Sequence, residues 1–195
     1  GLAEKLRRLR SHGAAVSEIM RHQNHGFLMP EYNELGFNYR MTDIQGAVGL
    51  AQIEKFDYIL EKRREKAARY DEMLSQRCSF LKTPHVPAGY YHTYQSYVTM
   101  VDYAALGLPG VPEGNAFRNR LMGYLEEHGV STRQGTHAVH MLGYYRDKYG
   151  YRPESLPGAY ACDLLSLTLP LYVELSADDQ EYVVEQLEKG MQAVR

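Results

Sequence analysis

The chain has 195 residues, of which 44% are hydrophobic and 24% are charged, proportions that are ordinary for a globular protein. Its 22 basic and 24 acidic side chains give a formal net charge of -2, which excludes the overall basic excess usual in nucleic-acid-binding proteins. No apolar run approaches the roughly 18 residues of a membrane-spanning helix. The two cysteines, Cys78 and Cys162, lie far apart in the sequence, so we expect reduced thiols in a cytoplasmic protein. We expect neither a membrane nor a nucleic acid as partner.

A short amphipathic helix opens the sequence over residues 2–9, where Leu2, Leu6 and Leu9 recur at helical spacing between basic side chains. We expect it to end near Gly13, because glycine readily adopts the left-handed conformation that follows a helix. Since the sequence opens inside this helix, without Met or a capping residue, we expect it to be a piece of a longer chain. Residues 14–41 show no regular period but hold aromatic and apolar side chains, which indicates an ordered functional loop.

Two further helices are predicted before residue 80. Thr42 and Gln45 form the capping-box pattern at the start of the first, in which Ile44 and Val48 belong to an apolar stripe. The second covers residues 56–76. The rest of the chain is expected to contain a loop over 81–94, a turn over 109–114, strands over 95–101, 130–133 and 165–169, and helices over 115–128, 141–149, 157–163 and from Ser176 onward. This alternation predicts an α/β layer, with helices packed on a small sheet.

Two pairs of histidines three residues apart, His22 with His25 and His137 with His140, have a spacing that metal ligands also use. Neither pair has a cysteine or carboxylate at ligand spacing, so we predict no metal site. The sequence also lacks the glycine-rich phosphate loops, the nucleophile elbow and the HExxH motif. None of these motifs therefore assigns a function.

Asn38 and Arg40 carry more informative chemistry. Side chains alternate in direction along an extended segment, so these two are expected to point the same way and Tyr39 the other way. An amide donor and a guanidinium on one side can hold a phosphate or a carboxylate, and the start of the helix at Thr42 favours an anion nearby. The residues alone also allow a structural anchor for the loop.

Residues 36–47, with the sequence GFNYRMTDIQGA, resemble the GxNxR segment and following helix of the DegT/DnrJ/StrS sugar aminotransferases. This family consists of pyridoxal-phosphate (PLP) enzymes with the aspartate aminotransferase (type I PLP) fold. Further segments resemble the family in the same order along the chain, namely residues 2–13, 92–94, 129–137, 140–145 and 165–172. The resemblance implies an α/β structure, the C-terminal part of that fold. Residues 1–55 would be the tail of the large PLP-binding domain with an interface loop, and residues 56–195 the C-terminal small α/β domain.

The resemblance implies an aminotransferase that uses pyridoxal 5'-phosphate to transfer an amino group from glutamate to a keto-sugar nucleotide, in polysaccharide or deoxysugar biosynthesis. It also implies a homodimer whose active site is shared across the interface, where Asn38, with Arg40 as its companion, reaches the partner's cofactor phosphate. Residues 22–32 would form the loop beside the sugar-nucleotide site. The family pattern breaks at residues 134–136, which leaves the sugar contact open. The candidates for substrate binding are Tyr39, His137 and His140.

No catalytic residue is expected in this sequence. In the family, the lysine that holds the cofactor covalently precedes the helix over residues 2–13, and none of the seven lysines here matches its position. We therefore expect this chain alone to be inactive. Three alternatives stay open: a non-catalytic chain or split-enzyme partner, a PLP-dependent sugar dehydratase or cyclitol aminotransferase, and an unrelated α/β binding module.

Overall fold

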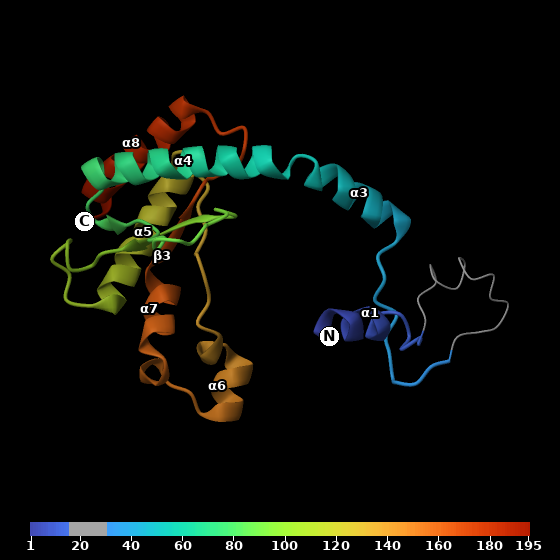
Figure 1. The fold of residues 1–195 in the computed structure, drawn as a ribbon. Coiled ribbons are helices and arrows are strands. Elements are labelled where there is room, and N and C mark those ends of the chain that lie inside the picture. Colours follow the sequence, from blue (N-terminus) through green and yellow to red (C-terminus); the bar gives the residue numbers. More distant parts are fainter. Residues whose placement is uncertain (16–30) are drawn as a thin grey trace. The chain divides into compact units, whose positions relative to one another are not determined.

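The computed structural model describes residues 1–15 and 31–195. His22, His25 and most of the loop predicted over residues 22–32 lie outside the described residues. The chain divides into two compact units, residues 1–56 and 57–195, whose helices and strands are labelled in Figure 1. The assignment of these parts of the chain to a large and a small domain stays a prediction.

The first unit contains two helices, α1 (Leu2–Leu9) and α3 (Asp43–Ile53). The predicted capping box of α3 is confirmed, because Gln45 N donates to Thr42 Oγ1 over 3.3 Å and Thr42 N donates to Gln45 Oε1 over 2.9 Å. Neither helix buries a side chain. The apolar stripes predicted for these helices are left uncovered within the described residues, with Leu2 75% and Ile44 79% exposed.

The second unit is built on a three-stranded antiparallel sheet in the order β1-β2-β3. Its strands are β1 (Leu81–Lys82), β2 (Tyr97–Val101) and β3 (Ser166–Leu169). Leu81 lies opposite Val101, and Thr99 lies opposite Leu167. The side chains of Tyr97, Thr99 and Val101 are buried and those between them are half-buried, which is the alternation that predicts β2 from the sequence.

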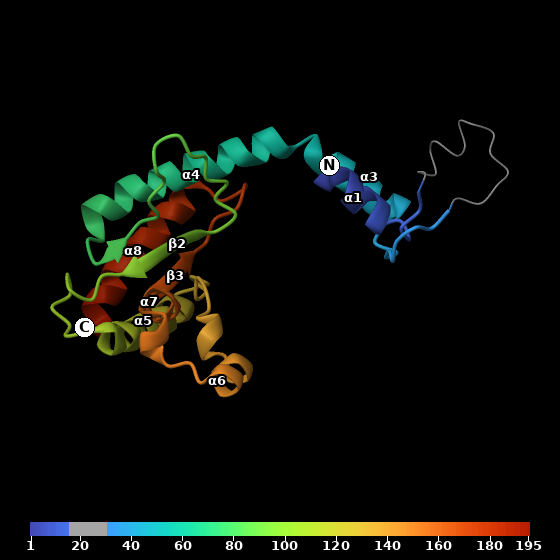
Figure 2. The ribbon, with the colours of Figure 1, turned by 60° about the horizontal axis from the view of Figure 1, so that its bottom comes forward.

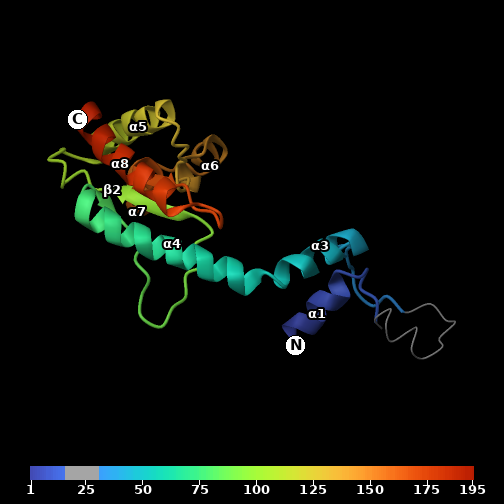
Figure 3. The same ribbon diagram turned by 90° about the horizontal axis from the view of Figure 1, so that it is seen from above.

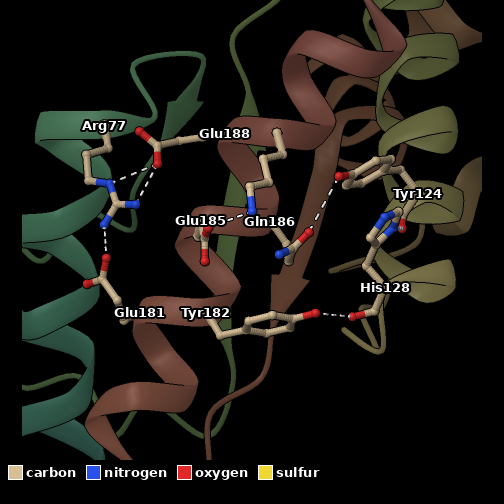
Figure 4. Close-up of polar contacts among 9 residues, drawn as sticks. Arg77, Tyr124, His128, Glu181, Tyr182, Glu185, Gln186 and Glu188 are labelled. Carbon is tan, nitrogen blue, oxygen red and sulfur yellow. Dashed lines mark hydrogen bonds and ion pairs between the residues drawn. The ribbon is translucent and has the colours of Figure 1, made fainter.

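Four helices pack with this sheet, α4 (Phe56–Arg77), α5 (Val111–Glu127), α7 (Pro157–Leu165) and α8 (Ala177–Val194). Figure 4 shows α8 lying between α4 and α5. Figure 3 shows α5 and α8 side by side, and Gly190 permits this approach, because a Cβ there would lie 2.7 Å from both Leu121 Cδ1 and Tyr124 Cδ1. The predicted cap of α8 is confirmed by the hydrogen bond of 3.0 Å from Asp179 N to Ser176 Oγ.

The core of this unit lies between the sheet and helices α4, α5 and α8. Aromatic side chains fill much of it: the rings of Tyr70 and Tyr97 are 5.1 Å apart, and those of Phe80 and Phe117 meet edge to face at 5.9 Å. Leu121 is fully buried among them. The burial of such side chains is the main source of stability in a domain of this size.

The segment over residues 139–155 leads into α7. It contains the 3-10 helix η1 (Val139–Met141), helix α6 (Gly143–Tyr149) and the 3-10 helix η2 (Pro153–Ser155). Helix α6 buries no side chain and lies on the far side of the unit from α4, as Figures 1 and 2 show. No described helix is both long enough and apolar enough to cross a membrane.

Three details of the predicted elements are wrong. Helix α5 begins at Val111, inside the predicted turn, because Pro112 in the first turn of a helix removes an N–H that has no partner there. Residues 130–133 form only an isolated bridge from Arg133 to Thr168 in the described structure. The predicted loop over 81–94 begins with the two-residue strand β1, which is too short to show alternation in the sequence.

Candidate functional site

The first candidate site is a corner of the first unit where the segment that contains Asn38 crosses the end of α1. Phe37 N donates to Leu9 O over 2.6 Å, and Tyr39 N donates to Arg10 O over 2.9 Å. His12 N donates to Phe37 O over 3.0 Å. The first two bonds use carbonyl groups that a helix end leaves without internal partners, and all three hold the Asn38 backbone against the end of α1.

Two glycines make this crossing possible. Gly13 has a φ of +74°, in the left-handed region that favours glycine. A Cβ on Gly36 would lie 2.0 Å from Gly13 N, so the two backbones touch where no side chain fits. Gly13, in the family-like segment over residues 2–13, and Gly36, in the GxNxR-like segment, therefore belong to one structural feature. An ion pair of 2.8 Å between Arg8 Nε and Glu34 Oε1 adds a side-chain contact beside it.

Asn38, Tyr39 and Arg40 are all exposed in the described structure. The rings of Phe37 and Tyr39 stack at 5.1 Å with an angle of 14° between their planes, so these alternate residues share a side. This agrees with the alternation from which Asn38 and Arg40 are expected on the other side. The segment ends at the capped start of α3, where backbone N–H groups favour an anion.

The second candidate site is a cavity of about 620 Å³ in the second unit. One wall is a face of α5 and the other is the connection that leaves α5. Its lining is mostly polar, which suits a ligand that carries hydroxyl or charged groups. The residues that line it are Asn119, Met122, Gly123, Glu126, Ser131, Thr132, Arg133, Gln134 and His137.

The turn from Arg133 to His137 is fixed by contacts with α7 and β3. Arg133 pairs with Thr168 through backbone hydrogen bonds of 3.2 Å and 2.7 Å. Gln134 Nε2 donates to Thr136 O over 2.8 Å and also to the Asp163 carboxylate. Gly135 N donates to Ser166 Oγ over 3.0 Å. A Cβ on Gly135 would lie 2.3 Å from Val98 Cγ1, so this close approach also requires glycine.

Helix α5 in turn supports the end of α7. Asn115 Nδ2 donates to Leu164 O over 2.8 Å, and Arg118 Nη1 donates to Ser166 O over 3.0 Å. Arg118 is 5% exposed, and burial lowers its pKa, although the nearby Asp163 charge opposes this change. Arg118 Nε also donates to Asn119 Oδ1 over 3.0 Å, which orients an amide of the cavity lining.

The two histidines predicted to bind substrate have different surroundings. His137 is exposed and lines the cavity, whereas His140 is only 4% exposed and does not line it. His140 meets Tyr151 edge to face at 6.1 Å, and its Nε2 has no hydrogen-bond partner among the described residues. The burial leaves His140 little surface for a direct contact with a ligand. Substrate binding by either residue stays a prediction.

The exposed Asn38 and Arg40 have the chemistry to hold the phosphate of a PLP cofactor, whereas no lysine of this chain has the buried setting of a covalent site. All seven lysines lie in the described residues and none is buried. Hydrogen bonds from Lys62 to Glu65 and from Lys189 to Glu185 raise the pKa of each lysine, the opposite of what a nucleophilic amine requires. Among residues 1–15 and 31–195, no three side chains of His, Cys, Asp or Glu gather as a metal site would require.

Sequence reasoning missed the framework of both sites. It named His137 but not Arg133 or Asn119, which line the same cavity, nor Arg118, which orients Asn119. Arg133 lies within the segment that resembles the family, so its position beside His137 was a usable signal. Arg118 lies among other polar residues of α5 and carries no local sign of burial.

The sequence and fold match a known family of enzymes. The model of the DegT/DnrJ/EryC1/StrS aminotransferase family matches residues 1–188, so the chain belongs to this family. Spore coat polysaccharide biosynthesis protein SpsC of Bacillus subtilis (strain 168) is 31% identical to it over 184 residues, or 94% of this chain and 45% of SpsC. The chain therefore spans about half the length of this curated relative.

Solved aminotransferase structures share the fold of this chain over about half of their own length. The aminotransferase TlmJ from Streptoalloteichus hindustanus is 27% identical, with a TM-score of 0.74 over 98% of this chain and 45% of that chain. Spr1654 from Streptococcus pneumoniae, in its PLP form, has a TM-score of 0.78 at 20% identity and shares the fold over 100% of this chain and 44% of its own. The fold of this chain is the C-terminal part of the type I PLP aminotransferase fold, as the resemblance to the family implies.

Proposed function

We propose that this chain is the C-terminal portion of a PLP-dependent aminotransferase that transfers an amino group from glutamate to a keto-sugar nucleotide. The observation that carries the proposal is the family match over residues 1–188, with family segments in order along the chain. The name of SpsC, a spore coat polysaccharide biosynthesis protein, supports a polysaccharide pathway. When bound, the cofactor supplies the electron sink for amino transfer, and the protein supplies binding and orientation.

In this proposal, Asn38 and Arg40 hold the phosphate of a cofactor bound in the partner subunit of a homodimer. The rigid crossing at Gly13 and Gly36 supports this role, because a phosphate contact needs a backbone that is fixed in advance. Tyr39, stacked on Phe37, would lie beside the substrate. The exposed apolar residues of α3, such as Ile44 and Ile53, support a second chain as their cover.

His137 is the proposed contact for the sugar nucleotide, because it faces a polar cavity of suitable size. Substrate binding by buried His140 stays a prediction, and its contact with Tyr151 would hold the segment that follows. We place the enzyme in the cytoplasm, a setting that the free thiols of Cys78 and Cys162 support.

The experiment that tests the function uses the natural polypeptide that contains this sequence. Its intact mass and visible absorbance spectrum are measured first, followed by amino transfer from glutamate to keto-sugar nucleotides. We expect a chain longer than 195 residues, a cofactor band and an aminated product. A dehydrated sugar as the product would instead indicate the dehydratase class, and a protein without the cofactor band would overturn the proposal.

The phosphate contact has its own test. Asn38→Ala is expected to weaken PLP retention roughly tenfold, the effect of losing one hydrogen bond to a charged group. Asn33→Ala is the matched control, since Asn33 is an exposed amide of the same segment. Cofactor affinity is measured by absorbance after dialysis. Equal retention in the two variants would remove Asn38 from the phosphate site.

A further inference from the structure

The cavity beside α5 contains a cation that has no side-chain partner in the part of the chain that the structure describes. The Arg133 side chain is exposed and makes no hydrogen bond or ion pair with any described residue. His137, on the same turn, likewise has no described side-chain partner. Most other arginines of the second unit, such as Arg77 and Arg118, are engaged by carboxylates or carbonyl groups.

The turn that carries Arg133 is held in a defined conformation by several hydrogen bonds. Its backbone is bonded to Thr168, Gln134 reaches Asp163, and Gly135 reaches Ser166. The absence of a Cβ at Gly135 lets the turn lie directly against Val98. A guanidinium on such a fixed backbone loses little backbone entropy when it binds a ligand.

The chemistry of the lining defines the ligand. A guanidinium with a free planar face matches two oxygens of a phosphate at once. The hydroxyl groups of Ser131 and Thr132, the amide of Asn119 and the carboxylate of Glu126 match sugar hydroxyl groups, which both donate and accept. The cavity of about 620 Å³ is within the size range of small-molecule sites.

We propose that Arg133, together with His137, binds the diphosphate of the sugar nucleotide, and that the polar face of α5 contacts its sugar. This inference rests on the proposed function for the identity of the substrate. It assigns Arg133 a role in substrate binding and Gly135 and Gln134 roles in positioning it.

The test measures binding rather than turnover. The natural polypeptide, loaded with PLP, is titrated with inorganic pyrophosphate by isothermal titration calorimetry. Arg133→Gln is expected to weaken pyrophosphate binding roughly tenfold to hundredfold, the effect of losing charge-assisted hydrogen bonds. Arg133→Lys keeps the charge but not the planar fork and should lose less. Arg146→Gln is the matched control, because Arg146 is an exposed arginine outside the cavity that pairs with Asp147 at 3.0 Å.

A second variant guards against a trivial loss of folding. Gly135→Ala keeps the Arg133 guanidinium but forces the turn that carries it away from Val98, so it should weaken pyrophosphate binding while the circular dichroism spectrum stays native. A dissociation constant that is equal in wild type and Arg133→Gln, or a wild type that does not bind pyrophosphate, overturns the inference.

Two further arms identify the ligand and separate this inference from the proposed function. UDP should lose affinity in Arg133→Gln in parallel with pyrophosphate. A loss that appears only with glucuronate would overturn the diphosphate assignment, because Arg133 would then hold a sugar carboxylate. Each titration is repeated without PLP, so the dependence of pyrophosphate binding on Arg133 is measured whether or not the protein holds the cofactor. A missing cofactor band would then overturn the proposed function, and pyrophosphate binding that does not depend on Arg133 would overturn this inference.

Discussion

The two units of this chain differ in how they are held together. All the buried apolar side chains of the described residues belong to the second unit, from Ala67 to Leu187. In the described part of the first unit, distant segments are joined by backbone hydrogen bonds at the end of α1, the contact of Gly13 with Gly36, and the ion pair between Arg8 and Glu34. Helices α1 and α3 leave their apolar side chains exposed.

This difference indicates that the two units have different sources of stability. The second unit buries its own hydrophobic core and can gain most of its folding free energy internally. The first unit has a rigid backbone corner but an exposed apolar surface, the mark of a part that needs a partner surface. A phosphate-binding segment suits such a part, since its geometry is fixed by the backbone while its side chains face outward.

The largest expected effect comes from the core of the second unit. Leu121→Ala removes a fully buried side chain and should lower the free energy of unfolding by about 2–5 kcal/mol. Val48→Ala, on α3 with 59% exposure, should change it by less than about 0.5 kcal/mol. Urea denaturation followed by circular dichroism measures both. A loss of more than about 1 kcal/mol in Val48→Ala that is the same at low and high protein concentration would contradict the comparison, because cover of α3 by a second chain depends on protein concentration.

The next effect concerns the glycine corner. Gly36→Ala places a Cβ against Gly13 N and should cost about 1–3 kcal/mol locally, as overpacking does. Hydrogen exchange at Phe37 N and Tyr39 N should then accelerate, and PLP retention should fall. Gly46→Ala is the control, because its Cβ meets nothing within 4 Å and alanine is a better helix former. Unchanged exchange in Gly36→Ala would mean that the corner does not hold Asn38.

Local chemistry in the sequence is enough to predict much of this fold. The caps at Thr42 and Ser176 depend on residues only three positions apart, and both occur as expected. The strand β2 follows from alternation within five residues. By contrast, β1 exists only because Leu81 meets Val101, and the bridge of Arg133 depends on Thr168. These pairings are set by tertiary structure, which a local pattern does not contain.

The same limit applies to the sites. The residue types at Asn38 and Arg40 indicate anion binding from the sequence alone, and the resemblance to the family adds this role's context and the role of His137. The contacts that fix them join distant segments: Gly13 with Gly36, Gln134 with Asp163, and Arg118 with Ser166. The burial of His140 is also invisible in its sequence neighbourhood, which is rich in exposed tyrosines.

A smaller effect tests electrostatics inside the second unit. Tyr97 Oη donates to Asp71 Oδ1 over 2.5 Å, and burial raises the pKa of Asp71 above 3.8 despite this bond. The folded chain therefore holds the proton more tightly than the unfolded chain, so Asp71 contributes stability at low pH that is lost as the pH rises through its folded-state pKa. Asp71→Asn removes this loss.

The free energy of unfolding of Asp71→Asn, relative to wild type, should therefore increase as the pH rises from about 4, the ordinary pKa of an aspartate, through the higher folded-state pKa. Urea denaturation at several pH values measures it. Asp57→Asn, an exposed carboxylate at the start of the same helix, is the control and should show no such trend. A relative stability of Asp71→Asn that falls over this range would reverse the assigned direction of the pKa change.

The smallest expected change in the free energy of unfolding comes from removing an ion pair in either unit. Arg77 joins α4 to α8 by donating to Glu188 Oε2 over 3.0 Å and 2.5 Å and to Glu181, as Figure 4 shows. Arg77→Ala should lower the free energy of unfolding by about 1 kcal/mol at low salt and less at high salt. Lys189→Ala, whose partner Glu185 lies on the same helix, should lose less.

In the first unit, Arg8→Ala removes the only ion pair described between α1 and the segment before Asn38. It should leave the urea midpoint of the second unit unchanged, because the ion pair that it removes lies within the first unit, and should accelerate hydrogen exchange at Phe37 N. If Arg8→Ala instead shifts the global midpoint as far as Arg77→Ala does, the two units unfold together. The corner of the first unit would then draw its stability from the core of the second, and the contrast between them would not hold.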